Sequence, residues 1–119
     1  MEQKIRSYKD LKMWQKAKDF SVHVYKETRF FPKEEVYGLT SQLRRASVSI
    51  VSNIAEGFRR WSSKEKVQFL RIAYGSGAEI ETQLLIATDL GYLKAKESES
   101  LLSELEEIMK MINVVINKL

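Results

Sequence analysis

The stretch LTSQLRRASVSIVSNIAEGFRR, residues 39–60, decides the fold. Its aliphatic residues recur at steps of four, three, four and four, at Leu39, Leu43, Ala46, Ile50 and Ile54. This is the spacing of one face of an α-helix, and the period-two alternation of a half-buried strand is absent. The stretch therefore predicts a helix with an aliphatic inner face and arginines and serines on its other sides.

The rest of the chain has the same helical periodicity. One proline and five glycines leave few breaks, so the chain divides into four long segments. We expect helices over about residues 8–29, 34–60, 63–90 and 96–118. Short connections make consecutive helices antiparallel. The sequence therefore predicts an all-α, antiparallel up-down-up-down four-helix bundle that forms one domain over residues 1–119.

Local signals mark several helix ends. Ser7 is a suitable N-cap for the first helix, and Pro32 separates the first helix from the second. Ser62 followed by Glu65 predicts a capping box at the start of the third helix. Gly91 is the expected left-handed residue after its end.

Composition narrows the function classes. The 119 residues include no cysteine, which removes disulfides, thiolate metal sites and thiol nucleophiles. The N-terminal residues have no apolar core, so we expect no secretory signal. No segment is apolar enough over its length to span a membrane. These features predict a cytoplasmic protein with no membrane contact.

Positive charge is concentrated near the start of the chain. The net charge is +4, and residues 1–33 alone carry nine Lys or Arg against four Asp or Glu. Such asymmetry suggests an anionic partner. On the predicted first helix the cations Lys9, Lys12, Lys16 and Lys26 share one stripe with His23. This stripe could follow a nucleic-acid backbone, although lysine-rich outer faces also simply keep helices soluble.

A second group of candidates lies on and after the second helix. The nucleic-acid-binding candidates there are Arg44, Arg45, Arg59, Arg60 and Trp61. An exposed indole beside arginines can stack on bases. The alternatives are that the arginines form a solvated or interface face and that Trp61 packs over the end of the bundle.

The second helix carries more apolar surface than packing against its neighbours in one bundle requires. On a helical wheel Val48, Val51 and Ala55 lie at a large angle from its inner face. These residues are candidates for the interface of a homo-oligomer. The alternative is a wide core face filled by small residues.

No catalytic set can be assembled from the sequence. His23 is the only histidine, so the paired Glu-x-x-His motifs of di-iron bundles are excluded. A carboxylate metal site at Glu56, Glu79 and Glu81 remains a minor hypothesis, and Glu81 is expected to be partly buried. We expect no enzyme activity, catalytic residue, metal, cofactor or small-molecule substrate.

Two adjoining segments carry a family resemblance. Gly38–Ala46 (GLTSQLRRA) and Ser49–Gly57 (SIVSNIAEG) are similar to the signature of the four-helix-bundle proteins encoded in intervening sequences of bacterial 23S rRNA genes. The motifs Tyr8–Leu11, Gly75–Thr82 and Leu90–Tyr92 extend the resemblance over nearly the whole chain. The sequence departs from the pattern at Val51, where many relatives have proline.

The resemblance implies a bacterial protein with this bundle, assembled as a homopentamer. A related group is the accessory protein of diversity-generating retroelements, a basic pentamer that works with a reverse transcriptase and nucleic acid. The resemblance supplies no catalytic residue. The leading hypothesis is a non-enzymatic oligomer that binds RNA or DNA electrostatically. The alternative is a protein-protein interaction scaffold or accessory subunit whose basic face serves solubility.

Overall fold

The computed structural model describes residues 4–119, so the first three residues of the predicted 1–119 domain lie outside the described part. Residues 4–119 contain four α-helices and no strand. The α-helices are α1 (Lys12–Thr28), α2 (Leu39–Phe58), α3 (Ser63–Asp89) and α4 (Ala95–Lys118). Two short 3-10 turns, η1 (Tyr8–Asp10) and η2 (Lys33–Glu35), precede α1 and α2.

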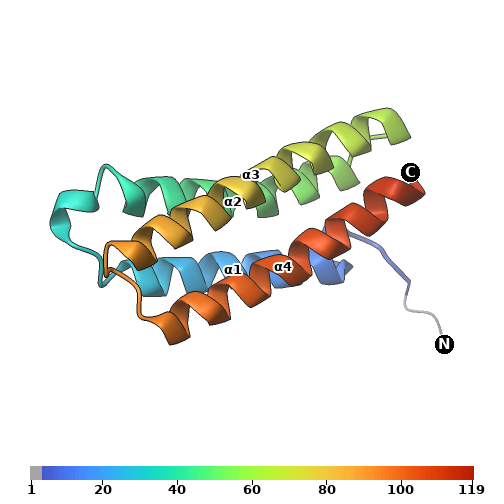
Figure 1. Cartoon of the computed structure of the whole chain (residues 1–119). Helices are drawn as coiled ribbons and strands as arrows, with labels where there is room; N and C mark the ends of the chain where they lie inside the picture. The colour runs from blue at the N-terminus through green and yellow to red at the C-terminus, as the bar shows by residue number, and fades with distance from the viewer. Residues whose placement is uncertain (1–3) are drawn as a thin grey trace.

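The four helices pack as a closed ring. Contacts join α1 to α2, α2 to α3, α3 to α4, and α4 back to α1. Successive helices run back and forth along the long axis, and the start of α1 and the C-terminal end of α4 lie at the same end of the bundle as the α2–α3 turn (Figure 1). The predicted all-α four-helix bundle is confirmed.

The predicted inner faces form the core. On α2, Leu43, Ile50 and Ile54 are completely buried. The other helices contribute buried residues at helical spacing, among them Ala17, Phe20, Val24, Ala73, Ile80, Ala87, Leu101, Leu105, Ile108 and Ile112. This burial of aliphatic side chains is the main source of stability in such a bundle.

The first predicted helix is interrupted near its start. Ser7 and Asp10 form a capping box, but this box caps the turn η1 and not a long helix. Leu11 is then extended, with φ −74° and ψ 127°, so α1 begins only at Lys12. The predicted start at residue 8 was therefore too early.

The predicted start of the second helix at residue 34 is also wrong. Residues 33–35 form the turn η2, and Gly38 lies outside the helical region with ψ −119°. The backbone N–H of Leu39 then donates to the Glu35 carboxylate at 3.1 Å. Glu35 therefore caps α2 from outside the helix.

The two ends of α3 were predicted from a capping box at Ser62 and Glu65 and from Gly91, and the structure confirms these predictions in part. Ser62 Oγ accepts from the Glu65 backbone N–H at 3.2 Å, as expected for an N-cap. The Glu65 carboxylate accepts from the Ser62 hydroxyl and not from its backbone N–H, so only half of the capping box forms. At the other end Gly91 has φ 81°, and the Tyr92 N–H bonds the Ala87 carbonyl. The predicted left-handed end is confirmed.

A polar pair crosses every seam between neighbouring helices. Serine and threonine hydroxyls join α1 to α2 (Ser21–Ser47, 3.0 Å), α2 to α3 (Ser49–Ser76, 2.9 Å) and α3 to α4 (Thr88–Ser98, 2.9 Å). The α1–α4 seam is crossed by charged groups instead. Because a buried polar group is costly when unpaired, these pairs favour one register of the helices.

Candidate nucleic-acid interface

The stripe of cations on α1 is partly neutralised by α4. Lys16 forms an ion pair with Glu107 at 2.8 Å. The hydrogen bond from Lys16, helped by the lysine charge, lowers the pKa of Glu107. His23, on the same stripe, hydrogen-bonds Glu104 of α4 at 2.7 Å. The α1–α4 seam is therefore a mixed-charge surface.

The other candidates of this stripe form no ion pair with α4, although Lys12 lines a hollow between α1 and α4 together with Met13 and Met111. Lys9, Lys12 and Lys26 are exposed, and none forms an ion pair within residues 4–119. Lys9 belongs to η1 and Lys26 to the last turn of α1, so they lie toward opposite ends of the bundle. The predicted stripe is thus not one continuous row of free cations.

The Arg44 side chain forms hydrogen bonds with the C-terminal end of α1. Its Nε donates to Thr28 Oγ1 at 2.9 Å and its Nη2 donates to the Tyr25 carbonyl at 3.3 Å. Its guanidinium also lies 4.7 Å from the centre of the Tyr25 ring. A cation near the last carbonyls of a helix stabilises that helix end, so Arg44 joins α2 to α1.

Arg45 points to the opposite side of α2. It is exposed and lines a polar groove between α2 and α3 together with Ser49, Ser76, Glu79 and Gln83. Arg45 forms no ion pair with another described residue. Structure thus separates Arg44 and Arg45, which are adjacent in the sequence.

The last two arginines lie at the α2–α3 turn. Arg59 lies over the Tyr8 ring at 5.5 Å, which brings the N-terminal segment against the end of α2. Arg60 pairs with Glu56 at 3.2 Å and lies 4.7 Å from the centre of the Phe69 ring. Both arginines therefore lie at the surface, and each guanidinium makes a cation–π contact with an aromatic ring.

Trp61 is 97% exposed at this turn. The alternative in which its indole packs over the end of the bundle is therefore wrong. It takes part in no ring stacking or cation–π contact with another residue of the described chain.

Two segments meet to make one end of the bundle strongly positive. We call residues 4–10 and 56–71 the basic end; together they carry eight Lys or Arg against three Asp or Glu. Its cations outside any described ion pair are Lys4, Arg6, Lys9, Arg59, Lys64, Lys66 and Arg71. The opposite end, residues 27–37 and 89–99, carries four Lys or Arg against six Asp or Glu.

Sequence reasoning named Lys9, Arg59, Arg60 and Trp61 but missed the other cations of the basic end. Among these, Lys64 and Arg71 lie on α3, where no stripe of like charge drew attention to them. A signal was available, because an up-down-up-down bundle necessarily places its N-terminus beside the second turn.

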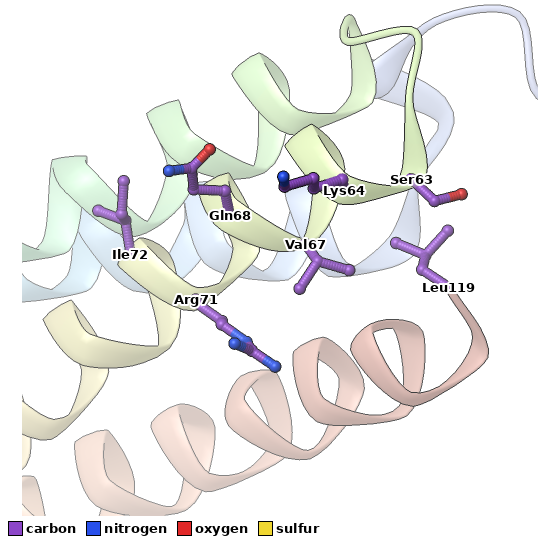
Figure 2. Close-up of a pocket in the computed structure, with 7 residues that line it drawn as sticks. All are labelled: Ser63, Lys64, Val67, Gln68, Arg71, Ile72 and Leu119. Atoms are coloured by element: carbon purple, nitrogen blue, oxygen red, sulfur yellow. The ribbon is translucent and has the colours of Figure 1, made fainter.

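The surface of the basic end is hollowed. An open hollow of about 750 Å³ follows the first three turns of α3 beside the end of α4. Figure 2 shows the side chains that line it, with Arg71 reaching toward α4 and Leu119 closing one side. The lining residues are Ser63, Lys64, Val67, Gln68, Arg71, Ile72 and Leu119, and none of them has a carboxylate side chain.

The oligomer candidates lie on the outer side of α2. Val48 is 42% exposed, whereas Val51 and Ala55 are half-buried and Val51 packs against the core. Across the seam on α1, Val22 is 48% exposed. Val22 and Val48 follow the bonded serines Ser21 and Ser47, so they flank one seam.

The carboxylate metal hypothesis is not supported. Glu81 was expected to be partly buried, but it is exposed on α3. Within residues 4–119, no three histidine or acidic side chains come together in a group that could hold a metal ion. No helix in this range is long and apolar enough to cross a membrane.

Comparison with solved structures identifies the same architecture elsewhere. A crystal structure of a protein of unknown function from the S23 ribosomal protein family of Bacteroides thetaiotaomicron is 24% identical in sequence. It superposes with a TM-score of 0.79, over 87% of this chain and 97% of that chain. At this identity the likeness shows the fold alone. No curated protein matches the sequence.

The family itself is identified by sequence. A family model described as 23S rRNA-intervening sequence protein matches residues 9–114, which include all of α1, α2 and α3 and most of α4. The match covers the segments that carried the resemblance, apart from Tyr8. The chain belongs to the 23S rRNA-intervening sequence protein family.

Proposed function

We propose that this protein is a non-enzymatic bundle that binds RNA or DNA electrostatically through its basic end, in the bacterial cytoplasm. The observation that carries this proposal is the concentration of eight cations against three carboxylates in residues 4–10 and 56–71. Cations outside ion pairs are free to displace counterions from a phosphate backbone, which supplies most of the affinity of sequence-independent binding.

The candidates from the sequence take different parts in this proposal. Lys9, Arg59, Arg60 and Trp61 belong to the basic end, and Lys12 extends it along α1. Lys16 and Arg44 hold neighbouring helices instead. Lys26 and Arg45 lie outside the basic end and are secondary candidates. The relation suggested by sequence to the accessory protein of diversity-generating retroelements favours the same class of partner.

A salt titration tests the proposal. Binding of the purified protein to labelled structured RNA and to duplex DNA is measured from low to physiological salt. We expect log affinity to fall linearly with log salt, with a slope that corresponds to several phosphate contacts. Absence of binding even at low salt would overturn the proposal and favour the protein-protein scaffold.

We also propose that the bundle is a homo-oligomer, with the pentamer that the family resemblance implies as the expected state. The support is the exposed valine pair at the α1–α2 seam, Val22 and Val48, beside half-buried Val51 and Ala55. An apolar strip on two adjacent helices favours association. Light scattering after size exclusion measures the mass directly.

A matched pair of variants tests this surface. We expect Val48→Glu to reduce the mass toward that of one chain, because it would bury a carboxylate in the interface. Val114→Glu, at a 51% exposed position on α4, should leave the mass unchanged. A monomeric wild-type protein would contradict the oligomer, and an unchanged mass of Val48→Glu would contradict this interface.

A further inference from the structure

The hollow beside the start of α3 presents hydrogen-bond donors and cations. Lys64 and Arg71 are cationic, and the Ser63 hydroxyl and Gln68 amide can also donate. Within residues 4–119, neither Lys64 nor Arg71 is held by an ion pair. The side chains that line the hollow include no carboxylate.

The same hollow has an apolar wall. Val67, Ile72 and Leu119 line it, and Ile72 and Leu119 are 49% and 45% exposed. A free inorganic anion would gain nothing from these side chains. A ligand that combines an anionic group with a flat or apolar part would use both kinds of wall.

Trp61 lies in the α2–α3 turn, two residues before Ser63, which lines the hollow. Three cations close to it in the chain lie over other rings: Arg59 over Tyr8, Arg60 over Phe69 and Lys66 over Phe58. Trp61 has no such contact within the described residues, and at 97% exposure both faces of its indole are open. An indole in this setting is a platform on which a nucleobase can stack.

We propose that Trp61 and the hollow together bind an unpaired segment of a single-stranded nucleic acid, with a base on the indole and phosphate at Lys64 and Arg71. This inference rests on the nucleic-acid binding proposed above and adds the class of strand. A duplex keeps its bases inside the helical stack, so it offers Trp61 no free ring face. The expected partner is therefore a loop, an end or an unwound strand.

The first test compares a short oligouridine strand with an RNA duplex of the same length. Trp61→Ala should weaken binding of the single strand by about 5- to 150-fold, the range measured for loss of one stacked base. Duplex affinity should change little. Because Trp61 is almost fully exposed, the variant should melt at the wild-type temperature, which separates lost stacking from lost folding.

Fluorescence gives an independent readout of stacking. Trp14 is half-buried against Tyr8, so Trp14→Phe leaves Trp61 as the only tryptophan. Oligouridine should quench its emission, whereas the duplex and free uridine monophosphate should not at matched concentration. Quenching by the monophosphate alone would overturn the assignment to a strand.

The phosphate contacts are tested through salt dependence. Lys64→Ala/Arg71→Ala should reduce the salt slope for the single strand by up to about 1.4, since each lost phosphate contact removes about 0.7. Lys94→Ala/Lys96→Ala, with the same loss of charge at the opposite end, should leave the slope unchanged. Trp61→Ala should also retain the wild-type slope.

The outcomes separate this inference from the proposed function. Salt-dependent binding with equal affinity for strand and duplex, and no effect of Trp61→Ala, would overturn the inference and leave the proposed function intact. Absence of binding to every nucleic acid at low salt would overturn both.

Discussion

At the scale of single residues, Glu35 joins three parts of the bundle. One carboxylate oxygen accepts the Leu39 N–H at the start of α2, and the other accepts the Tyr92 hydroxyl at 3.0 Å. Tyr92 lies in the α3–α4 connection and its ring packs 5.5 Å from that of Phe31. One side chain on η2 therefore fixes the end of the bundle opposite the basic end.

We predict that Glu35→Ala lowers the free energy of unfolding by about 1–3 kcal/mol, because it removes a helix cap and a second hydrogen bond. Glu34→Ala is the matched control. Glu34 is exposed and has no side-chain hydrogen bond with another described residue, so we expect a change within about 0.5 kcal/mol. Urea denaturation measures both, and equal losses would contradict the role of Glu35.

The Tyr92 hydroxyl gives this contact a pH dependence. Its hydrogen bond to Glu35 raises the pKa of Tyr92, and burial and the negative charges of Glu35 and Glu34 act in the same direction. The folded state thus holds the phenolic proton more strongly than the unfolded state, whose tyrosine pKa is about 10. The stabilisation is complete below that pH and is lost as pH rises through the higher folded value.

We therefore predict that the stability difference between the wild-type protein and Tyr92→Phe shrinks when pH rises above about 10. Chemical denaturation over an alkaline series measures it. Tyr74→Phe, which removes a hydroxyl with no hydrogen bond to a described residue, controls for general alkaline destabilisation. A difference that is constant across the series would contradict the Tyr92–Glu35 contact.

At the scale of helices, two glycines on α3 have different environments. A Cβ added at Gly77 would overlap the Met109 sulfur of α4, whereas one at Gly75 would meet no atom outside its own helix within 4 Å. The small residue at 77 therefore lets α4 approach α3 closely.

We predict different effects of alanine at these positions. Gly75→Ala should raise the free energy of unfolding by up to about 1 kcal/mol through helix propensity. Gly77→Ala should gain less or lose stability, since the Met109 side chain must shift to make room for the added methyl group. Thermal or urea unfolding compares the two, and an equal gain at both positions would show that Met109 moves aside freely.

Sequence periodicity predicted the helices well because each has one inner face. The stripe Leu43–Ile54 on α2 is buried as expected, and Gly91 ends α3 in the expected conformation. The start of α2 was missed because the turn η2 has helix-like composition while its cap comes from Glu35. The ion pair of Lys16 was missed for another reason: Glu107, its partner, lies 91 residues away, and periodicity within one helix carries no information about it.

At the scale of the whole molecule, charge is divided between the two ends. The basic end has eight cations against three carboxylates, and the opposite end has four against six. The sequence suggested a charged first quarter of the chain, but folding brings residues 4–10 beside residues 56–71 and separates both from the last turn of α1, with Lys26, and from η2, with Lys33. The resulting field should orient a polyanion toward the α2–α3 turn.

The most direct test of this account compares two charge reversals of equal size in the same salt titration. Lys9→Glu/Lys64→Glu changes the basic end, and Lys94→Glu/Lys96→Glu makes the same change in net charge at the opposite end. We predict that the first variant binds structured RNA at least about tenfold more weakly with a smaller salt slope, and that the second stays within about twofold of wild type. Equal losses in both variants would show that net charge alone governs binding and would contradict a contact at the basic end.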